Sequence, residues 1–185
     1  MIDLRLANKE FMESMKDTLQ KALRYAEAIK FKKTDLDFKK NKTLDSQIEN
    51  LENVIYFIAI KEDCNVKANT ICSTLRDFKN DKNLKIKFPK VNICDEGSDN
   101  KILYIGKSKG KMKGRFVSHL TSNSPSVYGL HLEYWQNNSD LNQLELELYY
   151  SKIDLKPEDI NSEILEILET SLHKKYKPIL GRSGH

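Results

Sequence analysis

Apolar residues recur at spacings of three and four along several parts of the chain, which is the period of a helix that packs on one side. This spacing predicts helices over residues 8–30, 68–79 and 160–176, the last of which ends before a proline and a glycine. Shorter helices are expected over residues 44–52, from residue 115 onward, and over residues 126–136.

Three other segments have the pattern of strands. Residues 54–60 (VIYFIAI) are an unbroken run rich in β-branched and aromatic side chains, so we expect a strand covered on both faces. Residues 101–106 predict a second strand. Residues 144–150 alternate between apolar and polar, which is typical of a strand with one face in water. The remaining segments are expected to be a loop over 31–42, a short strand or extended loop over 84–93, and a loop over 107–114.

These elements are too few and alternate too irregularly for a doubly wound sheet. We therefore predict an α/β chain of the α+β kind, with a small mixed or antiparallel three-stranded core sheet flanked by helices. An N-terminal helix and a long insertion between the first two core strands complete this fold. The expected division is an N-terminal helical region, 1–52, and a second domain, 53–185, which contains the insertion 64–100.

The 185 residues suffice for one ordinary domain, and 39% of them are hydrophobic, which is enough for a core. The longest apolar run has seven residues, so we expect no membrane helix. Charged residues in the first turns argue against a secretory signal. Three cysteines without a CxxC motif fit a reducing compartment better than a disulfide framework. The expected location is therefore cytoplasmic.

The net charge of +4 is modest, but the charges are unevenly distributed. Residues 101–119 contain six basic and no acidic side chains, whereas residues 133–169 contain ten acidic side chains against two lysines. The basic stretch could attract a polyanion, although a solvated lysine-rich loop would have the same composition.

Three features of this sequence suggest chemistry. Glu169 falls inside the apolar stripe of the last helix, where a carboxylate is costly unless it is paired, binds a metal, or reaches solvent from the edge. Arg115 and His119 are four residues apart and so share a helix face, where they suit a phosphate and a proton, or simply line the surface. Tyr56 and Tyr104 lie in the middle of two apolar strands, either as core residues or with both hydroxyls in one pocket.

The order of these residues resembles the GIY-YIG nuclease family. The matching segments are Val54-Ile55-Tyr56, then Tyr104-Ile105-Gly106, then Arg115 with His119, and finally Glu169 with Pro178. Three departures are visible: the first triplet is VIY, the two tyrosines are 48 residues apart, and Gly181 stands where the family has an asparagine.

The resemblance implies a metal-dependent DNA endonuclease that hydrolyses phosphodiester bonds, and a restriction-type or mobile-element-type enzyme is expected. Glu169 would hold Mg²⁺ or Mn²⁺, and Arg115 would stabilise charge on the phosphate. Tyr56, Tyr104 and His119 are the candidates for proton handling and water positioning, without a choice among them. The lysines that would hold the DNA backbone are Lys107, Lys109, Lys111 and Lys113.

Two other hypotheses about the function are compatible with the sequence. The loss of the asparagine at Gly181 favours a catalytically impaired nucleic-acid-binding module on the same fold. A third reading is an interaction protein whose N-terminal helix dimerises, and a homodimer is compatible with each reading. The insertion carries four further lysines and is expected either to grip DNA or only to extend the core; these lysines are Lys82, Lys85, Lys87 and Lys90.

Overall fold

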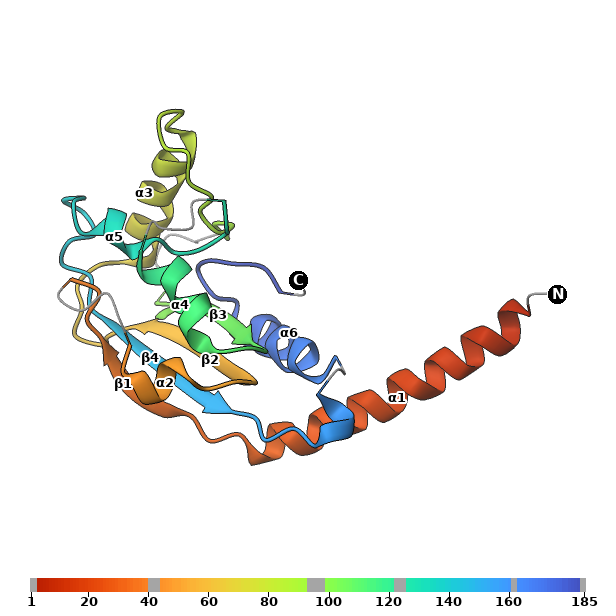
Figure 1. Cartoon of the computed structure of the whole chain (residues 1–185). Helices are drawn as coiled ribbons and strands as arrows, with labels where there is room; N and C mark the ends of the chain where they lie inside the picture. The colour runs from red at the N-terminus through yellow and green to blue at the C-terminus, as the bar shows by residue number, and fades with distance from the viewer. Residues whose placement is uncertain (1–2, 40–43, 93–98, 122–125, 161–162, 184–185) are drawn as a thin grey trace.

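The computed structural model describes residues 3–39, 44–92, 99–121, 126–160 and 163–183. Four strands form its centre: β1 (Lys32–Leu36), β2 (Val54–Ile60), β3 (Ile102–Ser108) and β4 (Leu146–Lys152). The helices, shown in Figure 1, are α1 (Leu4–Ala28), α2 (Ser46–Glu49), α3 (Ala68–Asn80), α4 (Met112–Leu120), α5 (Leu132–Trp135) and α6 (Ile164–Tyr176), with a 3-10 turn, η1, at Pro157–Asp159.

The strands form one antiparallel sheet in the order β1-β4-β2-β3. The predicted α+β class is confirmed, and the three predicted core strands are its neighbours β4, β2 and β3. The predicted loop over residues 31–42 is wrong in part, because Lys32–Leu36 forms the edge strand β1. Its side chains are mostly polar and exposed, and an edge strand is held by backbone pairing to β4 and needs little apolar burial.

Each face of the sheet is covered by different helices. Val54, Tyr56 and Ile58 of β2 point into the main core, which α3, α4 and α5 close. On the other face, Ile55 packs in a smaller cluster with Ala22 of α1 and the apolar side chains of α6. The sheet is therefore sandwiched over part of its area, and α1 extends away from the body beyond α6 (Figure 1).

The insertion between β2 and β3 rises above the sheet as α3 and a returning extended segment (Figure 1). The apolar edge expected on its helix is covered, since Ile71 and Leu75 are buried in the main core and Phe78 packs against it. Up to Asn92, where the described part of the returning segment ends, it makes a single bridge, between Val91 and Leu180, and so is an extended loop more than a strand. This bridge ties the insertion to the C-terminal segment beside β3.

Two other expectations need correction. The loop predicted over 107–114 is short, because β3 continues to Ser108 and α4 already begins at Met112. The helix predicted over 126–136 is confined to α5, since His131 adopts a left-handed conformation with φ of 50°, which interrupts a helix.

The cysteines also differ from expectation. Cys64 is a free, buried thiol, but Cys72 is disulfide-bonded, so the expectation of a chain without disulfides is wrong for Cys72. Among the described residues, no helix is at once long and apolar enough to cross a membrane.

Candidate active site

Two tyrosines and one glycine form the floor of the candidate site. Tyr56 on β2 pairs in register with Gly106 on β3, and Tyr104 lies two residues before this glycine on the same face. A Cβ at Gly106 would lie 2.6 Å from the Tyr56 hydroxyl and 2.9 Å from the ring of Tyr104. Glycine is therefore required at position 106 because both aromatic rings approach its backbone.

Helix α4 brings the two other predicted residues over this floor. Arg115 donates from Nε to the Tyr56 hydroxyl at 3.3 Å and from its terminal nitrogen to the Tyr104 hydroxyl at 2.7 Å. His119, one turn later, lies 2.8 Å from the same Tyr56 hydroxyl through Nε2. Four of the five predicted catalytic residues are thus joined in one hydrogen-bonded cluster.

The hydrogen bonds of His119 fix its tautomer. Its Nδ1 accepts the backbone N–H of Leu130 at 3.3 Å. Burial, together with the nearby charge of Arg115, lowers the pKa of His119 well below its ordinary value, so the ring is neutral at neutral pH. Its proton is then on Nε2, which donates to Tyr56. The Tyr56 oxygen therefore accepts two hydrogen bonds, one from His119 and one from Arg115.

The pKa values of both phenols, Tyr56 and Tyr104, are shifted upward. Burial raises the pKa of Tyr56, and the neighbouring Tyr104 raises it further, although Arg115 opposes both effects. Burial also raises the pKa of Tyr104, again against Arg115. The negative charge of Glu169 adds to the increase at both tyrosines, so the carboxylate acts on the cluster electrostatically.

Glu169 lies on α6, at the outer edge of β3. Its side chain is only 8% exposed, and its Oε2 accepts a hydrogen bond from Lys107 Nζ at 2.6 Å. Because residues alternate along β3, Lys107 is on the opposite face of the strand from Tyr104 and Gly106. Of the three outcomes expected for a carboxylate in the apolar stripe, the structure has the paired one, and its partner is a lysine.

A divalent cation would find one carboxylate here. The described residues contain no group of three or more histidine, cysteine, aspartate or glutamate side chains arranged to hold a metal. Mg²⁺ nevertheless commonly binds through one or two carboxylates, completing its shell with water and substrate phosphate. Glu169 Oε1 makes no hydrogen bond within the described residues, so this hard oxygen suits Mg²⁺ or Mn²⁺.

The lysines predicted to hold DNA are less available than the sequence suggests. Of these four, only Lys111 forms no ion pair with another described residue. The other three lysines are ion-paired: Lys107 with Glu169, Lys109 with Glu166 at 3.0 Å, and Lys113 with Glu49 at 3.6 Å.

The insertion supplies lysines without such partners. Lys82, Lys85, Lys87 and Lys90 are all exposed, and none forms an ion pair with another described residue. Gly181 donates its backbone N–H to the Lys90 carbonyl at 2.8 Å. A Cβ at Gly181 would lie 3.0 Å from the Tyr104 ring, so the insertion meets the candidate site at this glycine.

Sequence reasoning missed one buried polar residue next to the site. His173 follows Glu169 by one turn of α6, and its Nε2 lies 3.1 Å from the Ile105 carbonyl oxygen. Burial lowers its pKa. Its i+4 spacing from Glu169 was the available signal.

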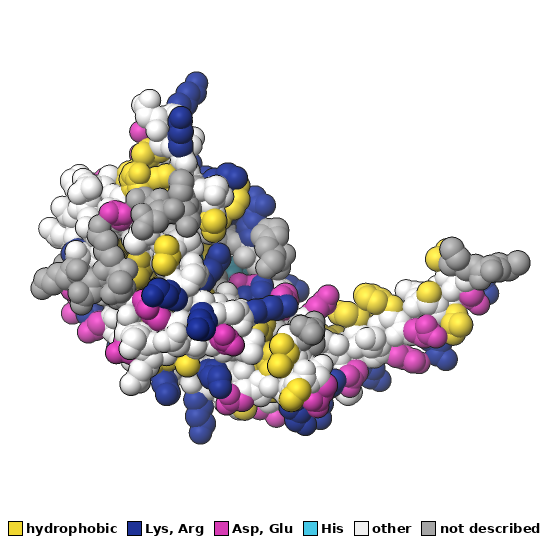
Figure 2. Space-filling view, in the orientation of Figure 1, with side chains coloured by type: hydrophobic (Ala, Val, Ile, Leu, Met, Phe, Trp, Pro, Cys, Tyr) yellow, Lys and Arg dark blue, Asp and Glu magenta, His cyan; other side chains and the backbone are white. Residues whose placement is uncertain are grey.

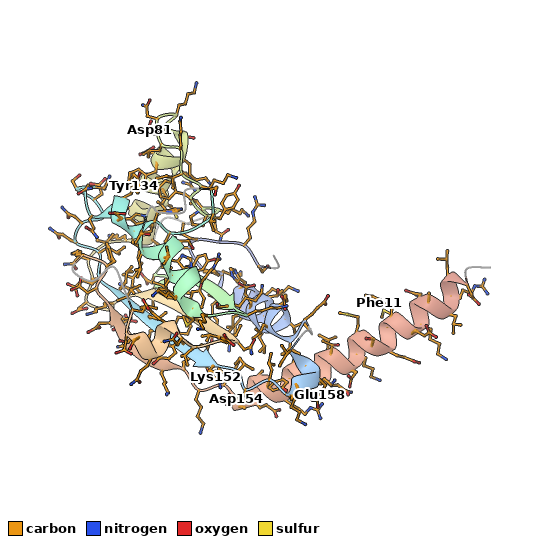
Figure 3. All side chains as sticks on the ribbon, in the orientation of Figure 1. Phe11, Asp81, Tyr134, Lys152, Asp154 and Glu158 are labelled. Carbon is orange, nitrogen blue, oxygen red and sulfur yellow. The ribbon has the colours of Figure 1, made fainter. Side chains whose placement is uncertain are left out.

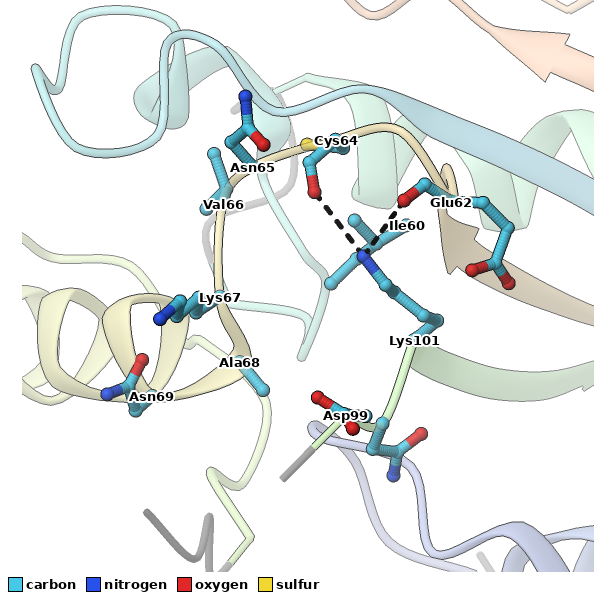
Figure 4. A pocket seen from close by; sticks show the side chains of 11 residues that line it. Ile60, Glu62, Cys64, Asn65, Val66, Lys67, Ala68, Asn69, Asp99 and Lys101 are labelled. Carbon is cyan, nitrogen blue, oxygen red and sulfur yellow. Dashed lines mark hydrogen bonds between the residues drawn. The ribbon is translucent and has the colours of Figure 1, made fainter. Parts of the chain in front are cut away.

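A surface pocket of the described residues lies away from this site. Figure 4 shows it at the start of the insertion, where Lys101 donates to the backbone carbonyls of Glu62 and Cys64. None of the predicted site residues lines this pocket.

No protein-family model matches the chain, and no curated protein or solved structure matches it significantly. Arguments about its function therefore rest on the geometry of the site.

Proposed function

We propose that the chain is a divalent-metal-dependent DNA endonuclease with a site of the GIY-YIG type. The observation that supports this most is the binding of both phenols by one guanidinium, with the buried carboxylate Glu169 close by. A cation, two phenols and a carboxylate are the groups that phosphodiester hydrolysis needs for charge stabilisation and proton transfer.

Arg115 would contact the scissile phosphate. Its bonds to Tyr56 and Tyr104 use Nε and one terminal nitrogen, so further N–H groups of the planar fork can reach a phosphate oxygen. Burial alone would lower the pKa of Arg115, but the two phenols raise it, so the guanidinium stays protonated. The positive charge is thus held in position before substrate arrives.

Tyr56 is the group we assign to proton transfer. Two N–H donors already point at its oxygen, and both would stabilise a phenolate. The Nε2 proton of His119 is committed to Tyr56, so we assign His119 a positioning role. Tyr104, which is 7% exposed, would orient the phosphate together with Arg115.

Glu169 would hold the metal, with Lys107 giving up or sharing the carboxylate. A divalent cation bound there would supply positive charge beside the phosphate and would offset the carboxylate charge that raises the pKa of both tyrosines.

DNA would lie along the edge formed by β3, the C-terminal segment and the insertion. The predicted contacts of Lys107, Lys109, Lys111 and Lys113 remain part of this proposal. The unpaired insertion lysines are better placed to release counterions, because they carry no internal ion pair that binding must break.

The direct experiment is nicking of supercoiled plasmid DNA by the purified chain. Relaxed and linear products should form with Mg²⁺ or Mn²⁺ and stop when the metal is chelated. The absence of any cutting under all these conditions would overturn the proposal.

A catalytically impaired nucleic-acid-binding module is the second candidate. The 2.6 Å pair between Lys107 and Glu169 favours it, since the lysine occupies one carboxylate oxygen, and Gly181 offers no side chain to the site. This candidate predicts salt-sensitive DNA binding without metal-dependent cutting.

A further inference from the structure

The projecting part of α1 leaves an apolar face without a partner. Six large side chains of this helix are between 51% and 76% exposed: Leu4, Leu6, Phe11, Met12, Leu19 and Leu23. At 100° per residue, five of them, all except Leu6, fall within an arc of about 120°. Figure 2 shows hydrophobic side chains along much of the upper side of this helix, and Figure 3 shows Phe11 far from the body.

The base of α1, in contrast, is firmly attached to the body. Ala22 is buried against α6. Tyr25 donates to Asp159 at 2.9 Å, and Lys21 forms an ion pair with the same carboxylate at 3.0 Å. The direction in which the helix leaves the body is therefore fixed, and its apolar face continues past the edge of that contact.

The exposed apolar area is at the upper end of what the largest patch of a monomer usually leaves in water. The five side chains expose about 600 Å² together, taking roughly 200 Å² for a large side chain. Two such faces would bury about 1,200 Å², which reaches the range of specific protein interfaces. A helix that projects alone is also only marginally stable in water over so few turns.

The charges of α1 argue against a lipid surface and for one orientation of a helix pair. From Leu4 to Ala28 the helix carries five basic and four acidic residues, so it lacks the excess of lysine and arginine typical of membrane-surface helices. Beside one edge of the apolar face lie Arg5, Lys9 and Lys16, whereas the nearest acidic residue beyond the other edge, Glu10, is about 100° away around the helix. An antiparallel pair would set the basic flank of one copy against the same flank of the other, and a parallel pair avoids this repulsion.

We propose that the chain forms a two-fold homodimer in which the apolar faces of two α1 helices pack in parallel. This inference does not depend on the proposed nuclease activity, because it rests on α1 alone.

Sedimentation equilibrium of the full chain tests it. At 1–100 µM the wild-type protein should have twice its chain mass of 21.5 kDa. Leu19→Glu should weaken association at least tenfold, because it places a charge in the apolar face. Gln20→Glu is the matched control: it adds the same charge at the adjacent position on the polar face, and it should leave the dimer intact.

Circular dichroism checks that both variants remain folded. Asn8→Cys tests the orientation, since this position lies in the apolar face and should form an interchain disulfide in a parallel pair. A wild-type monomer at 100 µM, equal effects of the two glutamates, or binding of the monomer to anionic vesicles would each overturn the proposal. Dimers without cross-linking at position 8 would overturn the parallel arrangement.

Discussion

The close approach of Tyr56 to Gly106 makes Gly106→Ala a sharp test of the site's geometry. The added methyl group would lie 2.6 Å from the Tyr56 hydroxyl and must be relieved by about 0.8 Å to reach an ordinary contact of 3.4 Å. Tyr56 is fully buried and hydrogen-bonded to His119 and Arg115, so it cannot swing into solvent.

The expected change in stability combines two costs and one gain. Overpacking in a closed core costs about 1–3 kcal/mol, and stretching the Tyr56–His119 bond adds about 0.5–1.5 kcal/mol. Replacing glycine within a strand returns about 0.5–1 kcal/mol. We therefore expect the free energy of unfolding to fall by about 2 kcal/mol, and Tm by about 4–8 °C. Misplacing a catalytic group by this distance should also slow cleavage roughly 100-fold.

Gly114→Ala is the matched control in urea unfolding. Gly114 lies within α4, and a Cβ there meets no atom within 4 Å, so alanine should stabilise the protein by about 1 kcal/mol. If Gly106→Ala were as stable as the wild type, Tyr56 would not lie against Gly106, and the hydrogen-bonded cluster would be wrong.

Three further predictions follow from the same contacts. Lys85→Ala should flatten the salt dependence of DNA binding more than Lys109→Ala does, since of the two only Lys109 is ion-paired; the log–log slope of affinity against salt measures this. Because the folded-state pKa of His119 is depressed, the unfolded chain binds more protons below pH 6.5. His119 should therefore lower the free energy of unfolding by up to about 1.4 kcal/mol per pH unit as the pH drops from there. His173 should add to this fall because burial lowers its pKa too, so His119→Gln should reduce the total slope by the share of His119. Arg115→Lys should slow cleavage at least 100-fold with intact folding by circular dichroism, because one ammonium cannot donate in the geometry of the fork; a rate near that of the wild type would exclude the phosphate role.

The pH dependence of cleavage separates the two candidates for the proton acceptor. Burial raises the pKa of Tyr56, so a rate limited by its phenolate should rise steadily from pH 7 toward pH 10. A rate that levels off above pH 6.5 would instead point to His119 and contradict the assignment of Tyr56.

The parts of the fold that were predictable are those where burial decides the structure. The run VIYFIAI of β2 permits only a covered strand, and the spacing of Ile71 and Leu75 specifies the buried side of α3. β1 escaped prediction because it is held by backbone pairing to β4, which leaves no trace in the side chains of Lys32–Leu36.

The candidate site was also predictable only in those features that the local sequence records. The residue types of Tyr56, Arg115 and Glu169 were recognisable from their order and from a carboxylate in an apolar stripe. The partner of that carboxylate was not, because Lys107 is 62 residues away in sequence and reaches Glu169 only once β3 and α6 pack together. For the same reason the sequence overestimates how available the lysines between Lys107 and Lys113 are to DNA, because three of them form ion pairs within the protein.

The central claim, a metal-dependent nuclease centred on Glu169, is tested most directly by plasmid nicking with Glu169→Gln beside Glu166→Gln. Both glutamates lie on α6, and each forms an ion pair with a lysine, at position 107 or 109, so the pair of variants separates the metal ligand from a neighbouring charge. With Mg²⁺, Glu166→Gln should cut at nearly the wild-type rate. Glu169→Gln should still bind DNA but lose at least 100-fold in cutting rate. Cutting by Glu169→Gln at the wild-type rate would contradict the account.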